Sequence, residues 1–168
     1  MKRIILHWTA GIGSPNSIEK RHYHYLIDSE GVVHNGVFKP EDNENCADGR
    51  YAQHTGGDNT GSIGVAMCGM AVGIGVNIKN TKYPITRVQC EKMFKLVAEL
   101  AKKYKISVTS SKVMTHYEFG LKHPNTSSAG KIDIVYLPPF PDVEKNKSGD
   151  FIRSKVRWYL AKISNLLD

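Results

Sequence analysis

Two histidines and one aspartate have the residue types and the placement needed to hold a metal ion. His7 follows the apolar run at residues 4–6, and His116 follows a second short apolar stretch that ends in Thr115. Asp133 lies beyond the next polar connection. Two imidazoles and a carboxylate, with water in the fourth position, are a donor set of catalytic zinc sites. Such a site activates water and polarises a carbonyl, so it suits hydrolysis.

The segments that carry the two histidines have the pattern of inner strands. The unbroken apolar run at residues 4–6 is typical of a strand buried on both faces, and residues 112–116 repeat apolar residues followed by Thr and His. If both strands end at the same edge of a sheet, His7 and His116 converge, and the loop before Asp133 could return it to them. The spacing alone leaves open that these are three unrelated polar residues near strand ends.

Periodicity predicts the other elements. A hairpin is expected over residues 23–37 and a third strand over 62–69, where two glycines indicate close approach of a neighbouring element. Thr86 and Gln89 form a capping box that begins a helix whose apolar face we expect in the core. A terminal amphipathic helix is expected over about 150–167.

Length and composition fit one globular domain, residues 1–168, without a linker. The net charge of +7 favours an anionic partner, but the basic residues are scattered and accompany no nucleic-acid-binding motif. The three cysteines are an odd number without CxxC spacing, which argues against a disulfide framework and a zinc finger.

The first residues are too short an apolar stretch for a signal peptide, and no stretch is long enough to span a membrane. We therefore expect a soluble monomer, made in a cytoplasm, without stable membrane insertion, which another agent must release if it works elsewhere.

Five segments, in this order, resemble the zinc-dependent N-acetylmuramoyl-L-alanine amidases of the type-2 amidase family, which includes phage amidases and peptidoglycan-recognition proteins. No single segment is specific, whereas the ordered set covers most of the chain. The segments are Leu-His-Trp-Thr at 6–9, Tyr-His-Tyr-Leu-Ile-Asp at 23–28, Ala-Gln-His at 52–54 with Asn59 and 62–65, Thr-His at 115–116, and Lys-Ile-Asp at 131–133.

The resemblance implies an α/β fold with a mixed central sheet flanked by helices, and zinc held by His7, His116 and Asp133. It also implies cleavage of the amide between N-acetylmuramic acid and the L-alanine of the stem peptide. Tyr23 and Lys131 match residues that assist catalysis in the family. A phenol donor and an ammonium near the former carbonyl oxygen stabilise the negative charge that develops there.

The resemblance also places His54, Thr55 and Asn59 along the cleft, where they bind substrate or shape the pocket. His24 alternates with Tyr23 along its predicted strand and so faces the other side. We expect a structural role for His24.

The chain departs from the family pattern in two places. Ala66 stands where recycling amidases carry a glutamate, and Glu118 is a possible substitute base, although a surface role fits it better. The connection after His116 is longer than in many relatives and contains His123, an alternative third ligand. We favour Asp133, because in an extended segment its side chain and that of Lys131 share one face.

These features predict a bacterial cell-wall hydrolase with peptidoglycan as its partner, of the single-domain phage or prophage endolysin type, and hence bacteriolytic. They suit an amidase effector delivered between bacteria equally well. A peptidoglycan-binding module that does not cut is a second alternative, against which the presence of all three ligands argues. A nucleic-acid-binding role rests on charge alone, and we do not expect it.

Overall fold

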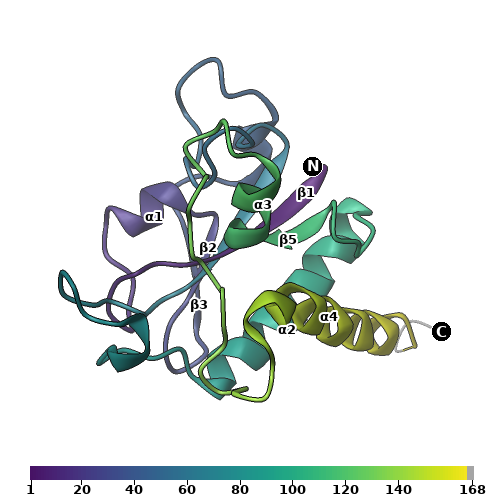
Figure 1. Ribbon diagram of the computed structural model, residues 1–168. Helices are drawn as coiled ribbons and strands as arrows, with labels where there is room; N and C mark the ends of the chain where they lie inside the picture. The colour runs from purple at the N-terminus through teal and green to yellow at the C-terminus, as the bar shows by residue number, and fades with distance from the viewer. Residues whose placement is uncertain (166–168) are drawn as a thin grey trace.

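A five-stranded mixed sheet forms the centre of the computed structural model, which describes residues 1–165 (Figure 1). The strand order is β3-β2-β4-β1-β5, and only the β2–β3 hairpin is antiparallel. This confirms the expected α/β fold with a mixed sheet. The strands are β1 (Arg3–Trp8), β2 (Tyr25–Ile27), β3 (Val33–Asn35), β4 (Ser62–Met67) and β5 (Val113–Thr115).

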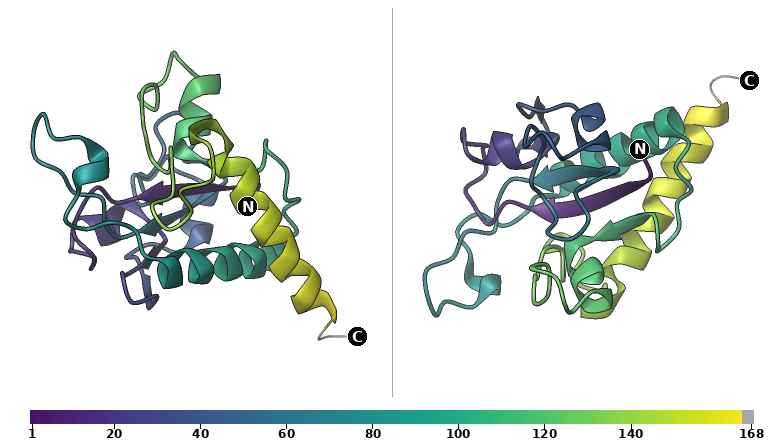
Figure 2. Two further views of the ribbon diagram at one scale, coloured as in Figure 1. Left: turned by 60° about the horizontal axis from the view of Figure 1, so that its bottom comes forward. Right: turned by 90° about the horizontal axis from the view of Figure 1, so that it is seen from above.

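The two long helices pack against each other and cover one face of the sheet, while α3 lies on the other face (Figure 2). The terminal helix begins slightly earlier than expected, and the last two residues of its expected range lie outside the described residues. The helices are α1 (Glu19–His22), α2 (Arg87–Tyr104), α3 (His116–Lys122) and α4 (Ser148–Asn165), with short 3₁₀ turns η1 (Pro40–Glu44), η2 (Ile78–Asn80) and η3 (Lys145–Lys147).

Side chains of β1 alternate between the two layers, as the two-residue repeat of a strand requires. Ile4 and Leu6 are buried in the main core with α2, whereas Ile5 packs in a second cluster with Phe119 of α3. The side chain of His7 points to the same face of the sheet as that of Ile5, which is the face that α3 covers. The long helices thus fill one face with apolar side chains, and the opposite face carries the smaller apolar cluster beside the polar residues of the site.

The capping box at the start of α2 is confirmed. The Thr86 side chain accepts a hydrogen bond from the Gln89 backbone N–H, and the Gln89 side chain accepts one from the Thr86 backbone N–H. The expected apolar face is buried at four of its five positions and half-buried at the fifth; these are Met93, Val97, Leu100, Ala101 and Tyr104. Helix α2 therefore packs against the face of the sheet opposite to the site.

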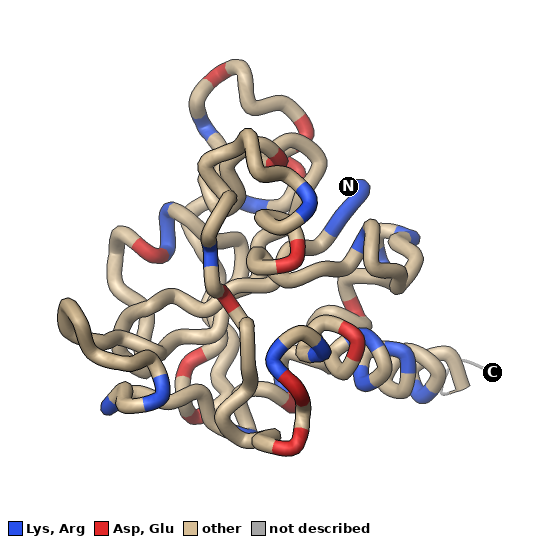
Figure 3. Tube along the Cα trace, viewed as in Figure 1, with Lys and Arg blue, Asp and Glu red and all other residues tan. Residues whose placement is uncertain are grey.

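Lys and Arg are spread over several elements of the chain, including the N-terminus and α4 (Figure 3). This distribution matches the scattered pattern in the sequence. Within residues 1–165, none of the helices combines the length and the apolar character needed to cross a lipid bilayer.

Candidate metal centre

Strands β1 and β5 bring the two histidines together. They run parallel, and their register pairs Leu6 with Thr115, so His7 and His116 leave the sheet at the same edge. The two ring centroids lie 4.7 Å apart. β5 is the edge strand and not an inner strand as expected. Convergence needs only parallel neighbours, so the expected meeting of the histidines still occurs.

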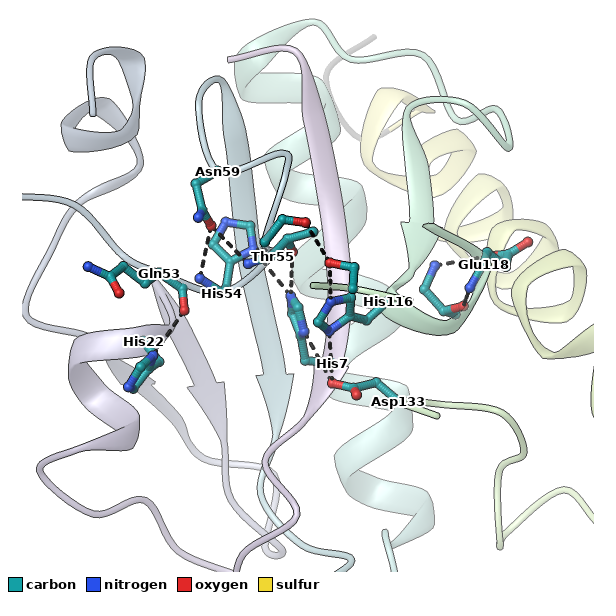
Figure 4. A network of polar contacts seen from close by, with 12 residues as sticks. His7, His22, Gln53, His54, Thr55, Asn59, His116, Glu118 and Asp133 are labelled. Atoms are coloured by element: carbon teal, nitrogen blue, oxygen red, sulfur yellow. Dashed lines mark hydrogen bonds and ion pairs between the residues drawn. The ribbon is translucent and has the colours of Figure 1, made fainter. Parts of the chain in front are cut away.

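Asp133 completes the group. Its Oδ2 lies 3.2 Å from His7 Nδ1 and 3.5 Å from His116 Nδ1. One ligand atom from each of the three residues lies within 4.8 Å of the other two (Figure 4). Both imidazoles thus present Nδ1 to the same carboxylate oxygen. Two imidazole nitrogens and a carboxylate in this arrangement fit a zinc ion.

His123, the alternative third ligand, lies elsewhere. Its ring is exposed to solvent, stacks on Phe119 with centroids 4.1 Å apart, and its Nδ1 lies 3.0 Å from the Phe119 carbonyl oxygen. It does not belong to the group formed by His7, His116 and Asp133. The geometry therefore favours Asp133.

The protonation states of the group suit metal binding. Burial lowers the pKa of His7 from 6.5 to about 4, an effect only partly opposed by Asp133. For Asp133, burial acts to raise the pKa, but a proton on Nδ1 of His116 or His7 outweighs burial, through its hydrogen bond and charge, and holds the pKa of the carboxyl below its usual range. At neutral pH His7 is neutral and Asp133 is ionised, which are the forms that ligate zinc.

His54 fixes which nitrogen of His7 carries the proton. Burial lowers the pKa of His54 well below 6.5, so its ring is neutral, and its Nε2–H donates to the Ser62 carbonyl at 3.1 Å. The remaining His54 nitrogen, Nδ1, is an acceptor that lies 2.7 Å from the Thr55 hydroxyl and 3.2 Å from His7 Nε2, and Thr55 Oγ1 is also 3.4 Å from His7 Nε2. Both neighbours of His7 Nε2 can accept, so they favour a hydrogen on Nε2 and leave Nδ1 free. A Cβ at Gly64 would lie 2.5 Å from the His54 ring, so glycine there permits this contact, as the strand glycines suggested.

The other residues assigned to the cleft are tied into the same loop. The Asn59 side-chain oxygen accepts hydrogen bonds from the backbone N–H groups of His54 and Thr55, and the Thr55 side chain is buried against His54 Nδ1 at 2.7 Å. Of the two roles expected for this trio, these contacts favour shaping of the pocket. Substrate contact by these residues stays a prediction.

Tyr23 and Lys131 line a pocket together with two of the three ligands, His116 and Asp133, while the fully buried His7 does not reach its surface. This pocket has a volume of about 360 Å³. The Tyr23 ring centroid lies 5.0 Å from that of His7, and burial, reinforced by Asp133, raises the pKa of the phenol. Tyr23 therefore keeps its proton at neutral pH and can donate it in a hydrogen bond. Lys131 is exposed at the rim.

Tyr23 precedes the strand in which we expected it. Strand β2 begins at Tyr25, and Tyr23 is the extended residue that ends α1. His24 is buried, donates from Nε2 to Asn43, and accepts at Nδ1 from the Gly64 N–H. These contacts agree with a structural role for His24.

Glu118 is committed to the scaffold. Its carboxylate forms an ion pair with buried Arg153 at 2.9 Å and accepts a hydrogen bond from the Thr115 backbone N–H at 3.0 Å. It lies apart from the three ligands in Figure 4. This favours the surface and scaffold role over that of a base.

One buried polar residue escaped the sequence analysis. Ser128 lies in the loop after α3 with no exposed area, and its Oγ is 2.9 Å from His116 Nε2. A serine in a polar loop gives no signal by itself, and only the folded loop brings it to the ligand.

Because burial lowers the pKa of His7 and His24, we expect the free energy of unfolding of the metal-free protein to decrease as the pH falls. The pKa values of His7 and His24 are both about 4 in the fold, against 6.5 ordinarily. Below about pH 6.5 the unfolded chain binds protons that these rings cannot bind, so the free energy of unfolding decreases towards pH 4. At about 1.4 kcal/mol per pKa unit and group, the loss is several kcal/mol.

Urea unfolding with a chelator at about pH 7 and about pH 5 measures this loss. The His123→Gln variant is a matched control. Removal of this exposed ring should leave the difference in the free energy of unfolding between the two pH values unchanged. Equal stability at the two pH values would contradict the prediction.

The chain matches one family of known proteins in sequence and resembles several solved structures in fold. A family model described as N-acetylmuramoyl-L-alanine amidase matches residues 1–133, and a search of curated proteins finds no match. Among solved structures, the amidase LysC from Clostridium intestinale URNW has a TM-score of 0.53 at 15% identity, covering 93% of this chain and 85% of that one. The E. coli amidase AmiD, in complex with the substrate anhydro-N-acetylmuramic acid-L-Ala-D-gamma-Glu-L-Lys, has a TM-score of 0.51 at 17% identity, covering 89% of this chain and 57% of that one. At these identities the two structures support the fold.

Proposed function

Since the chain belongs to the type-2 N-acetylmuramoyl-L-alanine amidase family, we propose that it is a zinc-dependent hydrolase of the bond between N-acetylmuramic acid and L-alanine in peptidoglycan. The observation that carries this proposal is the convergence of the Nδ1 atoms of His7 and His116 on Asp133 Oδ2. When bound, zinc supplies Lewis-acid activation of water and of the substrate carbonyl.

The chain's own residues supply the other parts of the reaction. Tyr23 holds a phenol proton beside the metal ligands, and Lys131 brings a positive charge to the rim of the same pocket. Both can stabilise negative charge on the former carbonyl oxygen. Within residues 1–165, Asp133 is the only carboxylate that lines this pocket. A glycosidase uses a pair of carboxylates, so the lining favours amide hydrolysis.

The bond that is cut provides the direct test. Digestion of purified peptidoglycan should release free stem peptides with a new L-alanine amino terminus. Chelator should stop the release, and added zinc should restore it at about one metal per chain. New reducing sugar ends, or release that persists in chelator with no zinc in the protein, would contradict the proposal.

We further propose that the protein acts as a phage or prophage endolysin. The net charge of +7 suits approach to anionic cell walls. Expression inside a bacterial host should leave cells intact until the membrane is permeabilised, after which turbidity should fall. The Asp133→Ala variant is the control and should leave turbidity unchanged. Lysis before permeabilisation would contradict the endolysin role and favour a protein that crosses to the wall unaided.

A further inference from the structure

Ser128 joins a metal ligand to the loop across the pocket. Its side chain has no exposed area and lies between two partners. Ser128 Oγ is 2.9 Å from His116 Nε2 and 2.7 Å from the backbone carbonyl oxygen of Gly56. A buried polar side chain with two such partners is fully satisfied within the protein.

The carbonyl gives this hydrogen-bond chain a direction. A hydroxyl has one proton, and a carbonyl oxygen can only accept, so Ser128 donates to Gly56. Ser128 Oγ can then only accept from His116, whose Nε2 must carry the hydrogen. A neutral imidazole has a single N–H, so His116 Nδ1 is left with a free lone pair. Nδ1 is the atom that faces Asp133 at 3.5 Å.

Asp133 favours the opposite tautomer. An ionised carboxylate beside His116 Nδ1 attracts a proton to that nitrogen, where the proton blocks metal binding. The contact with Ser128 is the shorter of the two, at 2.9 Å against 3.5 Å. We propose that Ser128 is a positioning residue that holds His116 in the Nε2–H tautomer and so keeps Nδ1 available for zinc. This rests on the proposed zinc-dependent function.

Close packing fixes the serine. A Cβ at Gly120 of α3 would lie 2.2 Å from the Ser128 carbonyl oxygen, so the loop lies directly on the helix that begins with His116. Ser128 is thus held from two sides, by α3 and by the loop at Gly56. His7 has a matching arrangement, because its Nε2–H points to His54, which donates to the Ser62 carbonyl. The series of hydrogen bonds behind each of the two histidines ends on a backbone carbonyl, that of Gly56 for His116 and that of Ser62 for His7.

The test compares the wild type with Ser128→Ala, Ser128→Thr and Ser127→Ala. The alanine variant removes only the hydroxyl, threonine keeps one, and Ser127 is the exposed neighbour in the same loop. Two-bond ¹H–¹⁵N spectra of the metal-free proteins, at a pH well above the ordinary histidine pKa of about 6.5, report the His116 tautomer. Competition with a chromogenic chelator reports zinc affinity.

We expect the Nε2–H signature in the wild type and in Ser127→Ala, and a shift towards Nδ1–H in Ser128→Ala. Zinc affinity of Ser128→Ala should fall ~10–100-fold, the usual cost of losing a partner that orients a ligand. Ser128→Thr should recover both properties. Thermal unfolding of the metal-free proteins checks that the alanine variant is folded.

Two results would overturn the proposal. One is an Nδ1–H tautomer in the metal-free wild type. The other is an affinity loss in Ser128→Ala without any change of tautomer, which would indicate a merely structural role. A wild-type protein that binds no zinc would instead refute the proposed function, while the spectra of the metal-free protein would still judge Ser128 on its own.

Discussion

Replacing Asp133 with alanine should weaken zinc binding by more than the ~10–100-fold that the loss of an outer contact costs, and should abolish hydrolysis. The reason is geometric. Asp133 Oδ2 is the atom on which both histidine Nδ1 atoms converge, at 3.2 Å and 3.5 Å. Without it the two imidazoles remain, and among the described residues around the site neither a third donor nor a negative charge is left. Zinc titration and peptidoglycan release measure the two effects.

His123→Ala is the matched control for this prediction. It removes the other potential ligand that follows His116, but its ring is exposed and stacks on Phe119, outside the group of ligands. Zinc affinity and hydrolysis should both stay near wild type. The reverse pattern, with zinc lost from His123→Ala and retained by Asp133→Ala, would show that the loop after α3 closes the site.

The positions of His7 and His116 could be predicted from the sequence because strand physics determines them. Short apolar runs form buried strands, and parallel neighbours end at the same edge of a sheet. The sequence could not tell that β5 lies at the edge, because the run at residues 113–115 is buried on both faces there as well. Helix α3 covers one of these faces, as the contact between Met114 and Phe119 shows.

The position of Asp133 beside the two histidines was harder to predict, because the long connection after His116 determines it. Residues 131–133 have no strand in the structure, although we expected an extended segment. Lys131 and Asp133 nevertheless line the same pocket, as the shared face predicted. The local Lys-x-Asp pattern favours Asp133 over His123 as the third ligand whatever path the loop takes.

The residues that orient the ligands could not be predicted in the same way. Ser128 contacts a ligand twelve positions before it and a carbonyl of Gly56, and both contacts depend on how two loops fold against each other. His54 was found through the resemblance, but its place behind His7 follows from the absence of a side chain at Gly64. Such contacts become visible only in three dimensions.

Removal of the Tyr23 hydroxyl or the Lys131 ammonium should lower kcat ~10²–10³-fold, the usual cost of losing one donor to the developing oxyanion. Tyr23→Phe keeps the ring that lies 5.0 Å from His7, so the packing and the zinc should remain. Lys131 is exposed at the rim, so Lys131→Ala should also fold and bind zinc. KM should change little, because both groups act on charge that is present only in the transition state.

The double variant and two controls separate this role from a structural one. If Tyr23 and Lys131 stabilise the same oxygen, the double variant should lose less activity than the product of the two single losses. Tyr117→Phe and Lys122→Ala are matched controls. Tyr117 donates to Asn146 and Lys122 is exposed on α3, and neither lines the pocket, so both variants should keep wild-type kcat. Loss of zinc from Tyr23→Phe or Lys131→Ala would mean that the residue supports the metal site, because an oxyanion donor is not needed until the substrate carbonyl is attacked.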